Sequence, residues 1–247
     1  MLLEEMTWKE IDAKGPGYWL PVIPTAVLEQ HGPHLPIATD CYVAWHVCRG
    51  ALAEHPRVLL CPVMSYATAT PMRNFPGSFI VRPETFMHQL RDVCLSMVRQ
   101  GFRHALIVNS HGGNTHVAQT ALREVAEAAD GFKTHFIHLF DMDEPHWTST
   151  VRSRRQGHAC WYETSMMLAV RPDLVRMDKK TDGWFPGDGI PCRKEVDWWD
   201  WRVETPSGVL GDTDGASSQI GQEILDFLVQ KVGDTAARIL SERGTIR

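Results

Sequence analysis

The sequence predicts an α/β fold in which a mainly parallel sheet is covered by helices on both sides. The first observation is that short apolar runs of strand character alternate along the chain with segments of helical periodicity. The second is the run "HALIVNS" (104–110), whose apolar stretch is typical of a strand buried on both faces. No internal repeat, low-complexity tract or linker interrupts the 247 residues, so a single domain over 1–247 is expected.

Four strands and five helices are expected in turn. Strands are predicted over 18–27, 57–64, 104–110 and 134–140, and helices over 39–55, 83–101, 115–129, 158–170 and 217–240. In the second of these helices Pro83 suits the first turn and Gly101 suits the stop. Its apolar face would carry Phe86, Leu90, Val93, Cys94 and Met97.

The remaining elements are defined by weaker signals. Asn114 is placed to cap the helix that follows the loop "HGGN", and Ile220, Ile224, Phe227, Leu228 and Val232 fall on one face of the last helix. The stretch 179–214 reads as irregular and is rich in tryptophan. Its members Trp184, Trp198, Trp199 and Trp201 would either form a lid over a ring-shaped ligand or pack against another subunit.

Composition and charge exclude several classes of partner. A net charge of −5 gives no general attraction for nucleic acid or for an anionic membrane, and no apolar run is long enough to span a bilayer. The opening residues "MLLEEMTWKE" lack the order of a signal peptide, so a cytoplasmic protein is expected. The six cysteines form no CxxC pair, which disfavours a cysteine metal site.

The stretch "LEQHGPHLPIATD" (28–40) follows the first strand and concentrates potential metal ligands. Glu29 and His31 could diverge from a short extended segment, and two prolines stiffen the turn after them. Asp40 then returns at the start of the next helix, where it could bind a metal or cap the helix, a role that Thr39 could also fill. From the spacing alone both readings stay open.

Two further clusters carry the same kinds of side chain. His111, in "NSHGGN", follows the third strand, and two glycines let the backbone bend sharply there. Ligand sites in parallel sheets lie beyond the carboxyl ends of strands, which is where Glu29 and His111 fall. In "GHACWYETS", His158 and Glu163 would point roughly 140° apart on a regular helix. They share a site only if His158 lies where the chain is not yet helical.

The motifs "EQHGPHLPIATD", "FPGS", "NSHGGN" and "GHACWYETS", in this order and at these separations, resemble the creatininase (creatinine amidohydrolase) family. The resemblance runs from about residue 21 to 165, plus the final helix. It implies a three-layer α/β/α sandwich, two divalent metal ions per chain, a small-molecule substrate and a homo-oligomer, expected to be a hexamer. The mixed His and carboxylate ligands suit Zn, Mn or Fe alike.

The resemblance also implies roles for particular residues. Glu29 and His111 match the ligands of one metal, His31 matches a ligand of the other, and Asp40 matches the carboxylate that bridges both. His158 matches a histidine that acts as an acid or base. The last matched residue, Glu163, corresponds to an acidic residue that would bind or polarise the second metal.

Two departures bear on the substrate. Creatininase proper has a glutamate two residues after its strand-end histidine, where this chain has Gly113. "HGGN" is the form of the wider family, which includes formamide deformylases and the mycofactocin peptidase, and this argues against creatinine itself. Many relatives also have a histidine shortly before the "FPG" turn, where the nearby residues here are Met72, Arg73 and Asn74. Arg73 could bind a substrate carboxylate, phosphate or hydroxyl, or be an ordinary surface arginine.

Together these features predict a metal-dependent amidohydrolase. It would cleave a C–N bond of a small cyclic amide or formamide through a metal-activated hydroxide, with His158 passing a proton to the leaving nitrogen. The alternative keeps the metals and changes the bond, opening a cyclic polyol ketone of inosose type by C–C cleavage. A non-catalytic binding protein is disfavoured because His158 and Glu163 are both present.

Overall fold

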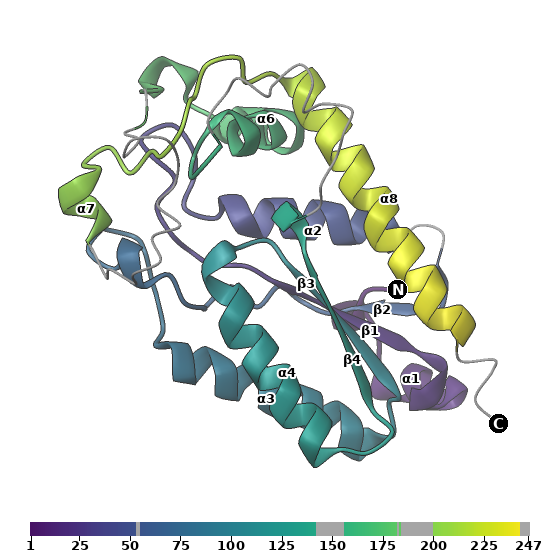
Figure 1. Ribbon diagram of the computed structural model, residues 1–247. Helices are drawn as coiled ribbons and strands as arrows, with labels where there is room; N and C mark the ends of the chain where they lie inside the picture. Colours follow the sequence, from purple (N-terminus) through teal and green to yellow (C-terminus); the bar gives the residue numbers. More distant parts are fainter. Residues whose placement is uncertain (53–54, 142–155, 182, 184–199, 243–247) are drawn as a thin grey trace.

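Four parallel strands form one sheet in the computed structural model, which describes every residue except 53–54, 142–155, 182, 184–199 and 243–247 (Figure 1). The strands are β1 (Leu20–Thr25), β2 (Val58–Leu60), β3 (His104–Asn109) and β4 (Lys133–His138), and their order across the sheet is β2-β1-β3-β4. β1 and β3 are therefore the central strands, and every one of their residues is buried.

The central strand β1 contains two prolines, which cannot donate to a sheet ladder. Pro21 comes before the first pair of β1 with β3, Val22–Leu106. Pro24 comes after the last pair of β1 with β2, Val22–Leu60. Each proline thus lies where one of the two ladders is absent, which is how a central strand tolerates both.

Helices cover both faces of the sheet (Figure 1). On one face lie α2 (Thr39–Leu52), α6 (Trp161–Val170) and α8 (Ser218–Glu242). On the other lie α1 (Trp8–Lys14), α3 (Pro83–Gln100) and α4 (Thr115–Ala128). The predicted three-layer α/β/α sandwich with a parallel sheet is confirmed, and in the described part of the chain no helix is long and apolar enough to cross a membrane.

The core consists of two apolar clusters that the sheet separates, because successive side chains of a strand point to opposite faces. In β3, Leu106 and Val108 pack with α2, α6 and α8, whereas Ala105 and Ile107 pack with α3 and α4. The apolar face predicted for 83–101 is confirmed, with Phe86, Leu90, Cys94 and Met97 buried and Val93 partly buried. Gly101 ends α3 in the left-handed conformation, with φ of 89°.

Several sequence-based expectations need correction. The strand predicted over 57–64 is only three residues long, and the helix predicted from 158 begins at Trp161. Asn114 does not cap α4 with its side chain; instead it accepts from the Thr68 amide and donates to the Ala26 carbonyl, joining three loops. Helix α1, fixed by a capping box of Thr7 and Glu10, was not predicted.

Short elements complete the described chain. They are α7 (Trp201–Glu204) and the 3₁₀ turns Leu3–Glu5, Pro16–Tyr18, Thr70–Met72, Gly112–Asn114, Leu139–Asp141, Pro172–Leu174 and Met177–Lys179. α7 lies inside the stretch predicted to be irregular, of which residues 182 and 184–199 fall outside the described residues. Trp184, Trp198 and Trp199 are among these, so only Trp201 of that group can be placed.

Candidate metal centre

Six of the seven predicted site residues meet beyond the carboxyl ends of β1 and β3. The loop after β1 supplies two of them, the first turn of α2 one, the loop after β3 one, and the start of α6 with the residues before it two. Five are buried and His111 is partly exposed. The six are Glu29, His31, Asp40, His111, His158 and Glu163.

Asp40 lies at the centre of this cluster. Its Oδ1 is 3.2 Å from Nε2 of His31, and its Oδ2 is 3.2 Å from Nδ1 of His111. Glu29 Oε1 lies 3.1 Å from the same His111 nitrogen. Both carboxylate oxygens of Asp40 therefore face imidazoles, which favours the hypothesis that Asp40 binds a metal over the hypothesis that it caps the helix.

The ligand atoms fall into two groups that share Asp40. The first is Glu29, Asp40 and His111, and the second is His31, Asp40 and Glu163; within each group the atoms lie within 4.8 Å of one another. A third group of three, Glu29, His31 and His158, overlaps both. Two divalent ions bound close together need such an arrangement, in which one carboxylate can reach both ions.

Each histidine of the cluster has one ring nitrogen against a backbone carbonyl. His31 Nδ1 lies 3.2 Å from the Glu29 carbonyl, His111 Nε2 lies 3.1 Å from that of Thr68, and His158 Nε2 lies 2.7 Å from that of Gln30. A carbonyl can only accept, so these nitrogens carry the proton. The other nitrogen of each ring faces the carboxylates and, once deprotonated, would be free to bind a metal, as in metal-ligating histidines.

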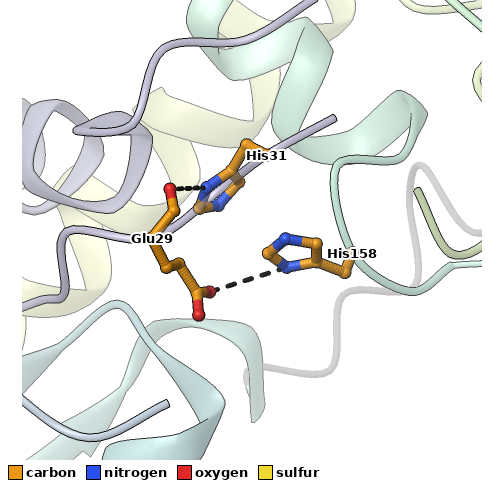
Figure 2. Close-up of side chains that lie close together, drawn as sticks. All are labelled: Glu29, His31 and His158. Carbon is orange, nitrogen blue, oxygen red and sulfur yellow. Dashed lines mark hydrogen bonds and ion pairs between the residues drawn. The ribbon is translucent and has the colours of Figure 1, made fainter. Parts of the chain in front are cut away.

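Figure 2 shows two of these contacts. His31 donates to the backbone of Glu29, and the side chain of Glu29 turns away from His31, toward His158, whose Nδ1 is 3.6 Å from Oε1. The two imidazole rings lie side by side with centroids 4.4 Å apart. Two histidines and a carboxylate are thereby held around one small space.

Several buried atoms of the cluster have no hydrogen-bond partner among the described residues. They are both carboxylate oxygens of Glu29, Nε2 of His31 and Oδ2 of Asp40. Burying an unsatisfied polar atom costs about 1–3 kcal/mol, and more for a charged group. Four such atoms facing one another are costly unless a cation binds between them, so the residues fit a divalent metal centre.

The charges of the metal-free cluster shift several pKa values. Burial acts to lower the pKa of His31, but the neighbouring carboxylates, Asp40 foremost, raise it to about 9. Burial likewise acts to raise the pKa of Asp40, yet His31 and His111 hold it well below its usual range. Burial raises the pKa of Glu163 to about 7, and burial with the charge of His31 lowers that of His158 to about 4.

The meeting of His158 with Glu163 depends on Ala159. This residue has φ of 53°, in the left-handed region that non-glycine residues rarely adopt. His158 lies before α6 and pairs with the backbone of Leu210, so it is not yet helical, as a shared site requires. The Ala159 amide donates to Oε2 of Glu163 at 2.5 Å, leaving Oε1 on the side of His31.

The glycine that departs from creatininase proper has no room for a side chain. A Cβ at Gly113 would lie 2.5 Å from Nε2 of His111 and 2.8 Å from the Thr68 carbonyl oxygen. These two atoms form the contact that orients the His111 ring. A glutamate here would therefore have to displace His111, whereas a Cβ at Gly112 would meet nothing within 4 Å.

A cavity of about 480 Å³ opens onto the cluster. Glu29, His111, His158 and Glu163 of the cluster line it, and Met72, Phe140, Trp201 and Leu210 are among its apolar lining residues. Nothing in the sequence indicates that Phe140 lines a cavity, and Met72 stands out there only as a residue near the "FPG" turn. Trp201 stands out only as one of a group.

Arg73 is not brought into the site. Its side chain is exposed, its Nη1 donates to the Thr70 carbonyl at 3.1 Å, and it is not among the described residues that line the cavity. Its role in substrate binding stays a prediction.

Comparison with known proteins agrees with the motifs. The family model Creatininase, described as creatinine amidohydrolase, matches residues 4–235. The chain belongs to the creatininase family. It is thus a creatininase-family hydrolase, and the resemblance read from its motifs is confirmed.

Relatives of this chain are named for different substrates. Creatinine amidohydrolase of Pseudomonas putida is 29% identical, covering 93% of this chain and 94% of its own. The mycofactocin precursor peptide peptidase of Mycobacterium ulcerans is 28% identical, covering 91% and 86%. The 3-dehydro-scyllo-inosose hydrolase of Thermotoga maritima is 23% identical, covering 95% and 83%.

Solved creatininase structures share the fold. A creatininase described with Mn superposes with a TM-score of 0.82 at 26% identity, covering 97% of this chain and 98% of the other. A mutant creatininase of Zn–Zn type superposes with a TM-score of 0.80 at 26% identity, with the same coverage.

Proposed function

We propose that this creatininase-family chain is a metal-dependent amidohydrolase that binds two divalent ions, Zn, Mn or Fe, and cleaves a C–N bond of a small cyclic amide or formamide. The observation that carries the proposal is the sharing of Asp40 by two groups of ligand atoms. Support comes from the buried atoms of Glu29, His31 and Asp40 that have no hydrogen-bond partner among the described residues. The Mn and Zn named for two structural neighbours are consistent with it.

Five residues of the cluster would bind the two ions. Glu29 and His111 would hold one ion, His31 and Glu163 the other, and Asp40 would contact both. When bound, such ions lower the pKa of a water molecule and polarise a carbonyl group. His158 belongs to neither of the two groups that share Asp40, although it falls in the third group with Glu29 and His31, and we assign it proton transfer instead of ligation.

His158 would move a proton at its Nδ1 atom. Its Nε2 is committed to the Gln30 carbonyl, so Nδ1 carries the lone pair, and the low pKa of the ring keeps it neutral near pH 7. Nδ1 could accept a proton from the attacking water and pass it to the leaving nitrogen. Nδ1 faces Glu29 of the cluster, and His158 lines the cavity, where that transfer would take place.

The relatives bear on which bond is cleaved. Two are named for amide substrates, creatinine and a precursor peptide, and one is named for an inosose. Opening of a cyclic polyol ketone remains the alternative reaction for the same residues. The cytoplasmic location, the hexamer, the single domain and the small size of the substrate remain predictions.

Removing and restoring the metal tests the proposal. The protein is stripped with a chelator, reloaded separately with Zn²⁺, Mn²⁺ or Fe²⁺, and analysed for bound metal and for turnover of cyclic amides, formamides and inososes. We expect two ions per chain and amide or formamide turnover only in reloaded samples. Turnover of amides by the stripped protein would exclude the metal mechanism, and turnover of inososes alone would select the alternative reaction.

A further inference from the structure

We propose that Trp201 determines the specificity of this site by selecting substrates that carry a planar apolar group next to the scissile carbonyl. The inference rests on the proposed function, because it takes the metal cluster as the reacting centre. It concerns a residue that comes from neither the ligand loops nor the helix of Glu163, but from the short helix α7.

Trp201 lies directly against the proposed proton-transfer residue. The indole and the His158 ring meet edge to face, with centroids 5.5 Å apart and planes at 80°. His158 in turn lies 3.6 Å from Glu29 of the cluster. A group bonded to a carbonyl that reacts beside His158 would therefore come within reach of the indole.

The cavity around Trp201 is mainly apolar. Phe140, Met72 and Leu210 contribute to its wall, and Pro71 and Val117 also line it. Outside the metal cluster, the polar side chains among its described lining residues are Thr68, Thr70 and His116.

This lining bears on the class of substrate. A polyol ring would lose water from several hydroxyls in exchange for few partners among the described residues, which is costly. An apolar ring would gain from the same walls. The described part of the cavity therefore favours a neutral amide with an aryl or similarly flat substituent.

Hydrogen bonds hold the helix that carries the indole. On one side of α7, Asn74 donates to the Asp200 carboxylate, and Arg202 donates to the Asn74 carbonyl at 2.7 Å. Asp200 also accepts from the Arg202 amide at 3.0 Å, which caps the helix.

A hydrogen bond also holds the chain that follows α7. Gln30 donates to the Gly208 carbonyl at 2.9 Å, so the ligand loop itself holds this segment. Because these hydrogen bonds hold α7 and the chain after it, the segment that carries Trp201 would lose little conformational entropy when a substrate binds. A small entropy loss raises the contribution of Trp201 to affinity.

Two hydroxamates test the inference without knowledge of the natural substrate. Acetohydroxamate and benzohydroxamate share a metal-binding head and differ in a methyl or a phenyl group. Their dissociation constants for the zinc-loaded protein are measured by isothermal titration calorimetry. We expect benzohydroxamate to bind about tenfold more tightly, because its phenyl group would contact the indole.

Variants of α7 then assign that preference. Trp201→Ala should reduce the tenfold ratio to about twofold or less while leaving the dissociation constant of acetohydroxamate nearly unchanged. Trp201→Phe, which keeps a flat ring, should retain most of the ratio and guards against a folding defect in the alanine variant. Val203→Ala is the matched control, since Val203 is 72% exposed on the same short helix and is not among the cavity residues; it should keep the full ratio.

The outcomes separate the two proposals. Equal affinities in the wild type, or a ratio that survives Trp201→Ala in folded protein, would overturn the role of Trp201 while leaving the metal centre intact. Failure of both hydroxamates to bind zinc-loaded protein would overturn the metal-dependent function, and the specificity inference with it.

Discussion

Asp40 and His31, nine residues apart along the chain, place Oδ1 and Nε2 within 3.2 Å of each other in the buried interior. The His31 nitrogen has no hydrogen-bond partner among the described residues, although the carboxylate is so close. A carboxylate oxygen and an imidazole nitrogen at this distance are placed as two ligands of one cation would be. We therefore interpret the loop between them, with its two prolines, as a rigid ligand loop.

The absence of a side chain at Gly113 should be essential for metal binding by His111. We expect Gly113→Ala to displace the His111 ring, because the new Cβ would lie 2.5 Å from Nε2 of His111. Metal analysis should show a loss of about one ion per chain and turnover should fall at least tenfold. Gly112→Ala is the control, since a Cβ there meets nothing within 4 Å. Equal behaviour of the two variants would show that His111 is not constrained in this way.

His158→Ala should retain both metals and lose rate. General acid–base assistance is typically worth about 10²- to 10⁴-fold, so kcat should fall by that order while the metal content stays at the wild-type value. His88→Ala, on the exposed surface of α3, should change neither quantity. A His158→Ala protein that lost metal would instead make this histidine a ligand.

Glu163→Gln should behave in the opposite manner. The glutamine can still accept the hydrogen bond from the Ala159 amide, so the fold should survive, but the negative charge that faces His31 is removed. We expect the variant to hold about one ion per chain instead of two. Glu127→Gln, exposed on α4, serves as its control. Retention of two ions by Glu163→Gln would remove this residue from the ligand set.

The stability of the metal-free protein should fall as pH rises. A histidine whose pKa is raised on folding stabilises the fold fully below its ordinary value, 6.5, and loses that contribution as pH rises through the folded value, about 9 for His31. His111, whose pKa is also raised, acts in the same direction. We expect the Tm of stripped protein to drop by about 5 °C or more across this window.

The metal-loaded protein provides the comparison for that measurement. Histidine ligands are already deprotonated when a cation is bound, so the Tm of the loaded protein should change much less over the same pH range. If the Tm of the stripped and the loaded protein changed with pH to the same extent, the charges of His31 and His111 would not contribute to the stability of the fold.

The sequence was sufficient for part of the site because of a general property of parallel sheets. Glu29 and His111 follow adjacent central strands, and the carboxyl ends of parallel strands share one edge, so their proximity could be expected. The meeting of His158 with Glu163 could not be derived in the same way. It depends on the left-handed conformation of Ala159, a residue type that gives no local signal for it.

The cavity walls were beyond prediction for a different reason. Phe140 was expected in a strand but lies in the 3₁₀ turn Leu139–Asp141, and Trp201 lies in the four-residue helix α7; only tertiary contacts bring them to one cavity. Helix α1 was missed although its capping box is a recognisable start signal, because its seven residues carry no strong apolar stripe. Asn114 was misplaced because its side chain finds buried partners in other loops instead of the end of its own helix.

An anomalous difference map from crystals of the zinc- or manganese-loaded protein would show whether Asp40 contacts two ions. We expect two peaks per chain about 3.5 Å apart, both in contact with Asp40, one beside Glu29 and His111 and the other beside His31 and Glu163. A single peak, or two peaks of which only one contacts Asp40, would contradict this expectation.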